Sequence, residues 1–235
     1  MRTKKLVSLL LAVSLSFAVM GCGNTGDVQE EEKTNTNRTA DQDMDMSGTD
    51  ASSGGAVTYE GEAFYMKDGQ VAGLQEEIIW DGCIWTVSSM ELTKELGNRS
   101  QADVNYWGEA VDELGNLTGD ESYLFVTVSC KNSSGSVQEV LLNSNGFVTV
   151  DEAGQLTEVG GEARYISKKQ DGNNSPAKAF HYILEDGEET GWIEIGYILE
   201  DSDFDDGNKL YYCVGRQGSA LGNPENRYVE VDRAQ

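Results

Sequence analysis

The sequence predicts an all-β protein in which a disordered tether leads into a sandwich of two antiparallel sheets with about nine or ten strands. From Val57 onward, short runs of β-branched and aromatic residues are separated by Asp-Gly or Asn-Gly pairs, which favour tight hairpins. Within these runs, hydrophobic side chains alternate with period two. Helical periodicity is confined to residues 89–96 and 101–114, where we expect at most a turn or two of helix.

The first 21 residues have the pattern of an export signal. Arg2, Lys4 and Lys5 form a positive N-terminal region, and residues 6–20 form an apolar run. This run is shorter than the roughly 20 apolar residues that span a bilayer. We therefore expect a signal peptide over residues 1–21 and not a permanent transmembrane helix.

The end of the apolar run resembles a bacterial lipobox. It reads Val-Met-Gly-Cys over residues 19–22, with cleavage expected between Gly21 and Cys22. The resemblance implies that the Cys22 thiol receives a diacylglyceryl group, and two acyl chains hold a protein stably at a bilayer. The protein is then expected outside the cytoplasm, anchored to the cell membrane by lipid. The alternative is an ordinary secretory signal in which Cys22 is incidental.

Residues 22–56 are expected to form the lipidated cysteine and a disordered acidic linker. This stretch has no aromatic side chain and few apolar ones, so it cannot bury enough surface to offset the entropy of ordering. Asp41, Asp43 and Asp45 alternate as in a calcium loop, but the turn glycine and closing glutamate are missing. The sandwich domain is therefore expected over residues 57–235.

Two strands carry the clearest alternation. In residues 191–199, the side chains expected to face the core are Ile193, Ile195, Tyr197 and Leu199. In residues 123–131, they are Leu124, Val126, Val128 and Cys130, with Phe125, Thr127 and Ser129 on the opposite face. Further strands are expected at residues 83–92, 137–142, 147–150, 163–168, 178–184, 209–215 and 227–232.

One internal similarity relates residues 111–118, VDELGNLT, to residues 150–157, VDEAGQLT. A duplicated binding loop or shared turn chemistry would explain it. Because Asp followed by Gly three residues later is typical of a chain reversal, we favour a turn at both places.

The order of elements resembles a known family. GCIWTV (82–87) is followed by YLFVTVSCKNSSG (123–135), an acidic hairpin and EDGEETGWIEI (185–195). Over residues 78–215 this is similar to the telokin-like, immunoglobulin-like sandwich domain of uncharacterised bacterial surface lipoproteins. The resemblance implies an immunoglobulin-like sandwich at the cell surface and no particular activity. The chain departs from the family in the insertion at residues 101–117 and in lacking a proline before Gly191.

Three cysteines remain in the expected domain, Cys83, Cys130 and Cys213, so at most one internal disulfide can form. Immunoglobulin-type domains often join their two sheets in this way. The alternative, which we favour, is three buried thiols that behave as small apolar side chains. No spacing of cysteine and histidine indicates zinc.

No catalytic signature stands out, so the protein is expected not to be an enzyme. The single histidine, His181, lies in an expected strand, where it is interpreted as structural. With 41 acidic residues, paired carboxylates carry no signal. Asp201, Asp203 and Asp205 could converge on calcium, but the EF-hand pattern fails because Gly and Glu are missing at its required positions. The alternative is an acidic connection between strands, and no cofactor is expected.

Charge and aromatic residues limit the partners. The formal net charge of −24 argues against nucleic acid, because phosphates would be repelled. Trp80, Tyr106 and Trp107 lie near expected turns, where they could stack on a sugar, although sandwich cores also use aromatic residues.

We therefore expect a lipid-anchored, non-catalytic binding or interaction module outside the cytoplasm, with a protein or polysaccharide partner at the cell surface. The first alternative is a carbohydrate- or cell-wall-binding sandwich. The second is a surface hydrolase that uses paired carboxylates, which would require two buried carboxyl groups facing each other in a cleft.

Overall fold

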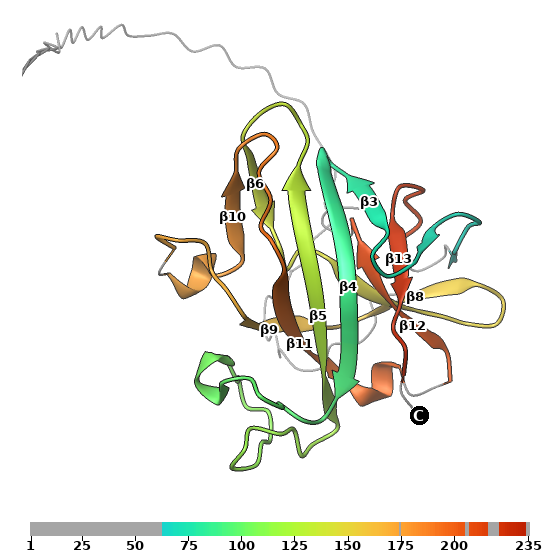
Figure 1. Cartoon of the computed structure of the whole chain (residues 1–235). Coiled ribbons are helices and arrows are strands. Elements are labelled where there is room, and N and C mark those ends of the chain that lie inside the picture. The colour runs from blue at the N-terminus through green and yellow to red at the C-terminus, as the bar shows by residue number, and fades with distance from the viewer. Residues whose placement is uncertain (1–62, 174, 205–206, 216–220, 234–235) are drawn as a thin grey trace, which may run out of the picture. The chain divides into compact units, whose positions relative to one another are not determined.

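The computed structural model describes residues 63–173, 175–204, 207–215 and 221–233 (Figure 1). The signal peptide over residues 1–21, the cleavage site at Gly21 and Cys22, and the linker to residue 56 lie outside the described residues. Asp205 lies outside them as well.

The regular secondary structure of the described residues consists of strands and three single turns of 3-10 helix. The strands are β1 (Phe64–Tyr65), β2 (Val71–Ala72), β3 (Glu77–Trp80), β4 (Cys83–Thr93), β5 (Glu121–Asn132), β6 (Gln138–Leu141), β7 (Gly146–Val150), β8 (Gln155–Val159), β9 (Glu162–Ile166), β10 (His181–Leu184), β11 (Ile193–Glu200), β12 (Lys209–Val214) and β13 (Arg227–Glu230). The helical turns are η1 (Gln101–Asp103), η2 (Pro176–Lys178) and η3 (Asp201–Asp203).

Two sheets form a sandwich, as predicted. One sheet has six strands in the order β1-β8-β7-β12-β13-β2, and the other has five in the order β3-β4-β5-β11-β9 (Figure 1). A small pair, β10-β6, stands beside them. Strand pairs in the described residues are antiparallel except for β13 and β2. The largest cluster of buried side chains includes residues of both sheets, such as Val126, Ile195 and Tyr212, and forms the central core.

Every strand named in the sequence analysis is present, with shifted ends. The expected strand at 178–184 begins only at His181, because Pro176–Lys178 forms η2. Four strands were not predicted: β1, β2, β3 and β8. The helical expectation at residues 89–96 is wrong, because β4 continues to Thr93, and within 101–114 only η1 is helical.

Phe125 lies on the face of β5 opposite to the central core, as predicted, but this face is buried. The core-facing set of β5 belongs to the central core, but Phe125 and Tyr123 are buried on the opposite face of the five-stranded sheet. Residues 94–119, called the covering segment below, pack there through Leu96, Val104 and Leu117. The period-two pattern predicted this strand, but it could not show that the face carrying Phe125 is covered by another part of the chain.

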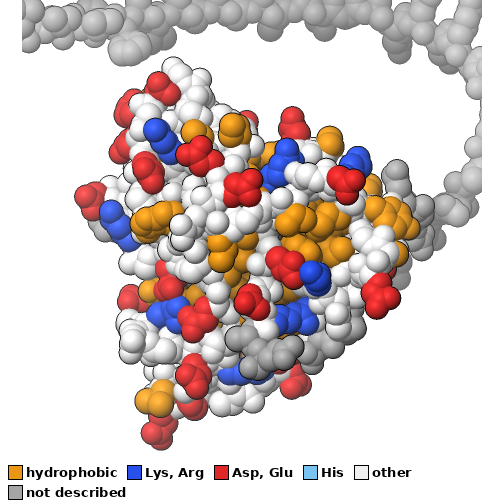
Figure 2. All heavy atoms as spheres, turned by 45° about the vertical axis from the view of Figure 1, so that its right-hand side comes forward, with side chains coloured by type: hydrophobic (Ala, Val, Ile, Leu, Met, Phe, Trp, Pro, Cys, Tyr) orange, Lys and Arg blue, Asp and Glu red, His pale blue; other side chains and the backbone are white. Residues whose placement is uncertain are grey.

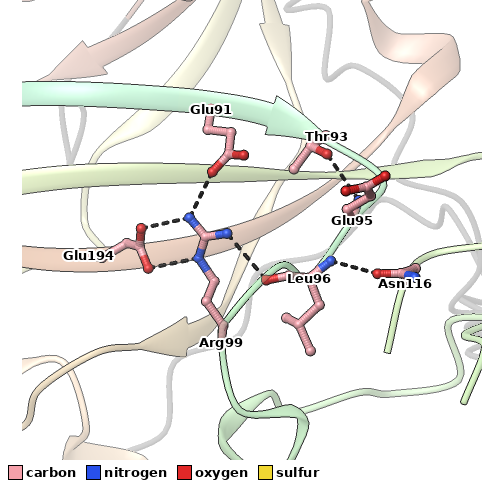
Figure 3. A network of polar contacts seen from close by, with 7 residues as sticks. All are labelled: Glu91, Thr93, Glu95, Leu96, Arg99, Asn116 and Glu194. Carbon is pink, nitrogen blue, oxygen red and sulfur yellow. Dashed lines mark hydrogen bonds and ion pairs between the residues drawn. The ribbon is translucent and has the colours of Figure 1, made fainter. Parts of the chain in front are cut away.

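Arg99 joins the covering segment to the sheet through hydrogen bonds and ion pairs (Figure 3). Its Nε donates to Glu194 Oε1 at 2.8 Å, and its Nη2 donates to Glu194 Oε2 at 2.7 Å and to Glu91 Oε2 at 2.8 Å. The guanidinium carbon lies 3.3 Å from the centre of the Phe125 ring. Because both acidic residues are on strands of the sheet, the bidentate pair fixes where the covering segment lies.

The two similar sequence segments form the same turn, which confirms the turn interpretation. Asp112 Oδ1 accepts the N–H groups of Leu114 and Asn116, and Asp151 Oδ1 accepts the corresponding N–H groups of Ala153 and Gln155. The glycines have nearly equal positive φ angles, 82° at 115 and 83° at 154.

The cysteines are buried thiols, as favoured from the sequence. Cys83 and Cys130 lie in the central core on neighbouring strands of one sheet, whereas Cys213 is buried on the outer side of the other sheet. The described cysteines therefore do not form the disulfide between sheets that immunoglobulin-type domains often contain. Burial raises the pKa of the Cys83 and Cys130 thiols.

Candidate functional site

A groove of about 490 Å³ lies where the covering segment meets β9 and the ends of β5 and β11. We call it the Trp107 groove. The residues that line it are Trp107, Gly108, Glu109, Glu121, Gly160, Gly161, Glu162, Arg164, Ile198, Leu199, Glu200 and Asp203. Its volume is within the range of small-ligand sites.

Trp107 is the exposed aromatic residue of this groove, with 67% of its surface accessible. The guanidinium carbon of Arg164, on β9, lies 3.7 Å from the centre of the Trp107 ring. A cation over an indole is an attractive arrangement, and it covers one face of the ring. The accessible surface of Trp107 is therefore mainly on the other face of the ring, and that face can stack on a ligand.

Arg164 is itself held firmly. Its side chain is only 10% exposed, with Nη1 2.7 Å from Glu162 Oε2 and Nε 3.3 Å from Glu109 Oε1. Nε is buried and has no hydrogen-bond partner among the described residues. Glu109 Oε2 also accepts the backbone N–H of Trp107 at 2.5 Å, so one carboxylate positions both members of the stack.

Backbone and hydroxyl contacts place the tip of the covering segment. The Asn105 N–H donates to the Arg164 carbonyl at 2.9 Å. The hydroxyl groups of Tyr106 and Tyr123 lie 2.7 Å apart, and that of Tyr106 donates to the Gly115 carbonyl at 3.1 Å. Tyr106 is therefore a packing residue.

The other aromatic candidate is also used for packing. Trp80 packs against the central core and lies so close to Gly215 that a Cβ there would come within 2.6 Å of its ring. Of the three aromatic residues proposed from the sequence, only Trp107 lines a groove and is exposed.

Two carboxylates oppose each other at the end of the sheet. Glu121 on β5 and Glu200 on β11 are direct partners across the antiparallel pair. Although Glu200 is largely exposed, loss of part of its hydration and repulsion from Glu121, Asp203, Asp201 and Asp120 raise its pKa. No salt bridge found among the described residues involves the carboxylate of Glu121, Glu200 or Asp203. Lys94 Nζ, which pairs with Asp201, donates to the backbone carbonyl of Glu121 at 2.7 Å.

The acidic connection after β11 does not gather as a calcium loop in its described part. Asp201 Oδ2 lies 2.5 Å from Lys94 Nζ, and its Oδ1 accepts the Ser122 hydroxyl at 2.6 Å. Asp201 is thus engaged by the covering segment and β5, while Asp203 lines the groove. Among the residues that the structure describes, no group of three histidine, cysteine or acidic side chains is arranged to hold a metal ion.

His181 lies in β10, as expected, and its Nδ1 is 2.9 Å from Glu139 Oε1 on the paired strand β6. A second groove of about 270 Å³ lies beside this pair. The arrangement is that of a cross-strand contact at the surface.

A further surface feature is apolar. Figure 2 shows acidic side chains spread over the face drawn and apolar side chains gathered in its middle. Exposed apolar residues of the domain include Val71 on the edge strand β2 and Ile79 on the edge strand β3. Nothing in the structure shows what would cover them.

Sequence reasoning found Trp107 but missed the rest of its groove. Arg164, Glu121, Glu162 and Glu200 come from three strands that are distant in the sequence, and no local spacing marks them. Their approach follows from the order β5-β11-β9, which the sequence alone does not reveal.

Comparisons with known proteins find a weak likeness to solved structures. No protein-family model matches the chain, and no curated protein matches it. It is similar to an uncharacterised β-sandwich protein of Clostridium difficile 630, with a TM-score of 0.36 and 10% identity over 71% of this chain and 98% of that one. It is also similar to a conserved hypothetical protein of Bacillus anthracis, with a TM-score of 0.35 and 11% identity over 66% of this chain and 93% of that one.

The described chain is thus a β-sandwich domain on the strength of its own two sheets. Within the described residues, no helix is long and apolar enough to cross a membrane.

Proposed function

We propose that the protein is a lipid-anchored, non-catalytic binding module outside the cytoplasm, and that the Trp107 groove is its contact site. The Arg-Lys-rich start, the apolar run and the Gly21-Cys22 junction support the anchor. The observation that carries the binding role is the exposed indole of Trp107, held over the buried guanidinium of Arg164 at the edge of a groove.

A carbohydrate ligand fits this groove best. An indole face accepts the apolar face of a sugar ring, and carboxylates accept hydrogen bonds from its hydroxyl groups. The Trp107 groove offers both, with Glu162 and Asp203 in its lining. We therefore propose a cell-surface polysaccharide as the partner.

The hydrolase alternative finds one supporting feature, the cross-strand pair Glu121 and Glu200 with its raised Glu200 pKa. Glu200 is exposed, however, and Glu121 is only partly buried. A general acid is usually held in a dry, apolar site that keeps it protonated. The exposure of the pair favours binding over catalysis. Release of sugar by the wild-type protein but not by Glu200→Gln would reverse this preference.

Lipidation is tested with the full chain expressed in a bacterium that processes lipoproteins. We expect the wild-type protein in the membrane fraction, with its N-terminal peptide beginning at Cys22 and carrying the mass of the lipid. The matched variant Cys22→Ser should lose the lipid and the acyl-dependent membrane retention. An unmodified Cys22 or recovery of the wild type from the cytosol would contradict the anchor.

The contact site is tested with purified cell wall and the lipid-free mature chain, residues 22–235 with Cys22→Ser. We expect Trp107→Ala to lower retention on the wall, and Trp192→Ala, which removes another exposed indole outside the groove, to leave it unchanged. Equal retention of the two variants would show that Trp107 is not part of the contact site.

A further inference from the structure

The charge of the Trp107 groove is strongly unbalanced. Its lining contains one guanidinium, that of Arg164, and the carboxylates of Glu109, Glu121, Glu162, Glu200 and Asp203. Arg164 forms its ion pairs with Glu109 and Glu162. Glu121 and Glu200 lie opposite each other on β5 and β11, and neither carboxylate takes part in a salt bridge among the described residues. The nearby cation, Lys94 Nζ, donates to the backbone carbonyl of Glu121 at 2.7 Å and forms its ion pair with Asp201.

Such a pair is unfavourable in the free protein. Like charges directly opposite on neighbouring strands repel each other. The repulsion is built into the backbone, because the register of β5 and β11 is set by the buried side chains along both strands. A bound cation would remove it, so the free energy of repulsion becomes part of the affinity for a positively charged group.

The neighbouring stack indicates what else the ligand carries. Arg164 is nine-tenths buried under Trp107 and lines the groove, and its Nε lacks a hydrogen-bond partner among the described residues. The guanidinium occupies one face of the indole and leaves the other face to a flat, weakly polar surface. A ligand that stacks on this face and also pairs with Glu121 and Glu200 has a ring with an apolar face and a cationic substituent.

We propose that the groove binds a sugar that carries a free amino group, as in a glucosamine-containing polysaccharide. The inference rests on the proposed binding function and names its ligand class. The sugar ring stacks on the exposed face of Trp107, and its ammonium group donates hydrogen bonds to Glu121 and Glu200. An N-acetylated sugar has the same ring but no charge, so it gains the stacking and not the ion pair.

The test compares two probes on the lipid-free mature chain, residues 22–235 with Cys22→Ser. Glucosamine tetramer and N-acetylglucosamine tetramer are titrated by calorimetry, under conditions in which the amine is protonated. We expect the amine probe to bind at least about tenfold more tightly, which corresponds to about 1.4 kcal/mol. Added salt should reduce this preference.

Variants separate the contribution of the ion pair from that of stacking on Trp107. Glu121→Gln combined with Glu200→Gln should abolish the preference for the amine probe and leave binding of the N-acetylated probe unchanged. Trp107→Ala should weaken both probes. The control Glu152→Gln changes an exposed acidic residue in the turn between β7 and β8, outside the groove, and should behave as the unsubstituted chain.

Three results would overturn the ligand class. Equal affinity for the two probes, lost in Trp107→Ala, would refute the amino sugar and retain the binding function of the groove. A preference for the amine probe that persists in the double glutamine variant would place the cation elsewhere. Failure of both probes would also reject the inference, whereas the binding function itself fails only if retention on cell wall is insensitive to Trp107→Ala.

Discussion

Arg164 and Trp107 form a stack in which the guanidinium carbon lies 3.7 Å from the centre of the indole. The two residues come from different segments, since Arg164 is on β9 and Trp107 is at the tip of the covering segment. Glu109 contacts both, through its ion pair with Arg164 and through the N–H of Trp107. An exposed tryptophan is thus held in place before a ligand arrives, which reduces the entropy lost on binding.

Replacing Trp107 should weaken ligand binding with little change in the free energy of unfolding. Because the side chain is largely exposed, Trp107→Ala should change the free energy of unfolding by less than about 1 kcal/mol, the size of an exposed cation–π contact. Affinity for a saccharide ligand should fall about tenfold or more, since stacking on an aromatic ring contributes about 1–3 kcal/mol. Denaturant unfolding and calorimetry check the two values. A large loss of stability would mean that Trp107 is a packing residue instead.

The paired turns at Gly115 and Gly154 allow a controlled comparison. Both glycines have φ near +80°, so alanine at either position should cost about 1–2 kcal/mol. At Gly154 an added Cβ meets open space, whereas at Gly115 it would come within 2.7 Å of Leu96 Cδ2. Overpacking adds about 1–3 kcal/mol, so Gly115→Ala should be the more destabilising change in urea unfolding. Equal effects would show that the covering segment can yield at this point.

Arg99 is expected to hold the covering segment in place. Arg99→Ala removes the bidentate pair with Glu194 and the contact with the Phe125 ring, and should lower the free energy of unfolding by about 2–3 kcal/mol. Lys209→Ala, which breaks an exposed pair with Glu230, is the control and should have a much smaller effect. Faster hydrogen exchange in residues 94–119 of Arg99→Ala would locate the loss. Unchanged exchange there would contradict the role of Arg99.

The raised pKa of Glu200 predicts a pH dependence of stability. A carboxyl group with a higher pKa in the folded state binds its proton more readily there, so its contribution to stability falls as pH rises from the ordinary carboxyl pKa through the folded pKa. Glu200→Gln should therefore stabilise the domain at neutral pH and have little effect in acid. Unfolding curves of both proteins across this pH range test the sign. A variant that is less stable at neutral pH would show that Glu200 is favourably paired.

The sequence predicted the sandwich because most of its long strands alternate clearly or follow turn residues. The strand over residues 191–199 is one example, with Ile193, Ile195, Tyr197 and Leu199 in the central core as expected. The short strands β1 and β2 were missed because two residues carry no periodicity. Phe125 lies on the predicted face of its strand, but its burial could not be predicted because the segment that covers it comes from elsewhere in the chain.

The candidate site was predictable only in part. Trp107 was predicted as a possible sugar-stacking residue because it is an aromatic residue near an expected turn, and it lines the groove. Tyr106, its neighbour, satisfies its hydroxyl against Tyr123 and Gly115, and nothing in the local sequence distinguishes the two roles. The Glu121 and Glu200 pair depends on strand register, which long-range packing determines.

Nuclear magnetic resonance of the four tryptophan indole N–H groups tests the central claim most directly. During titration of the lipid-free mature chain with glucosamine tetramer, we expect the Trp107 signal to shift, while the signals of Trp85, buried in the core, and Trp192, exposed outside the groove, stay in place. A Trp107 signal that does not move while the probe binds, or a shift confined to Trp192, would contradict the assignment of this groove as the ligand site.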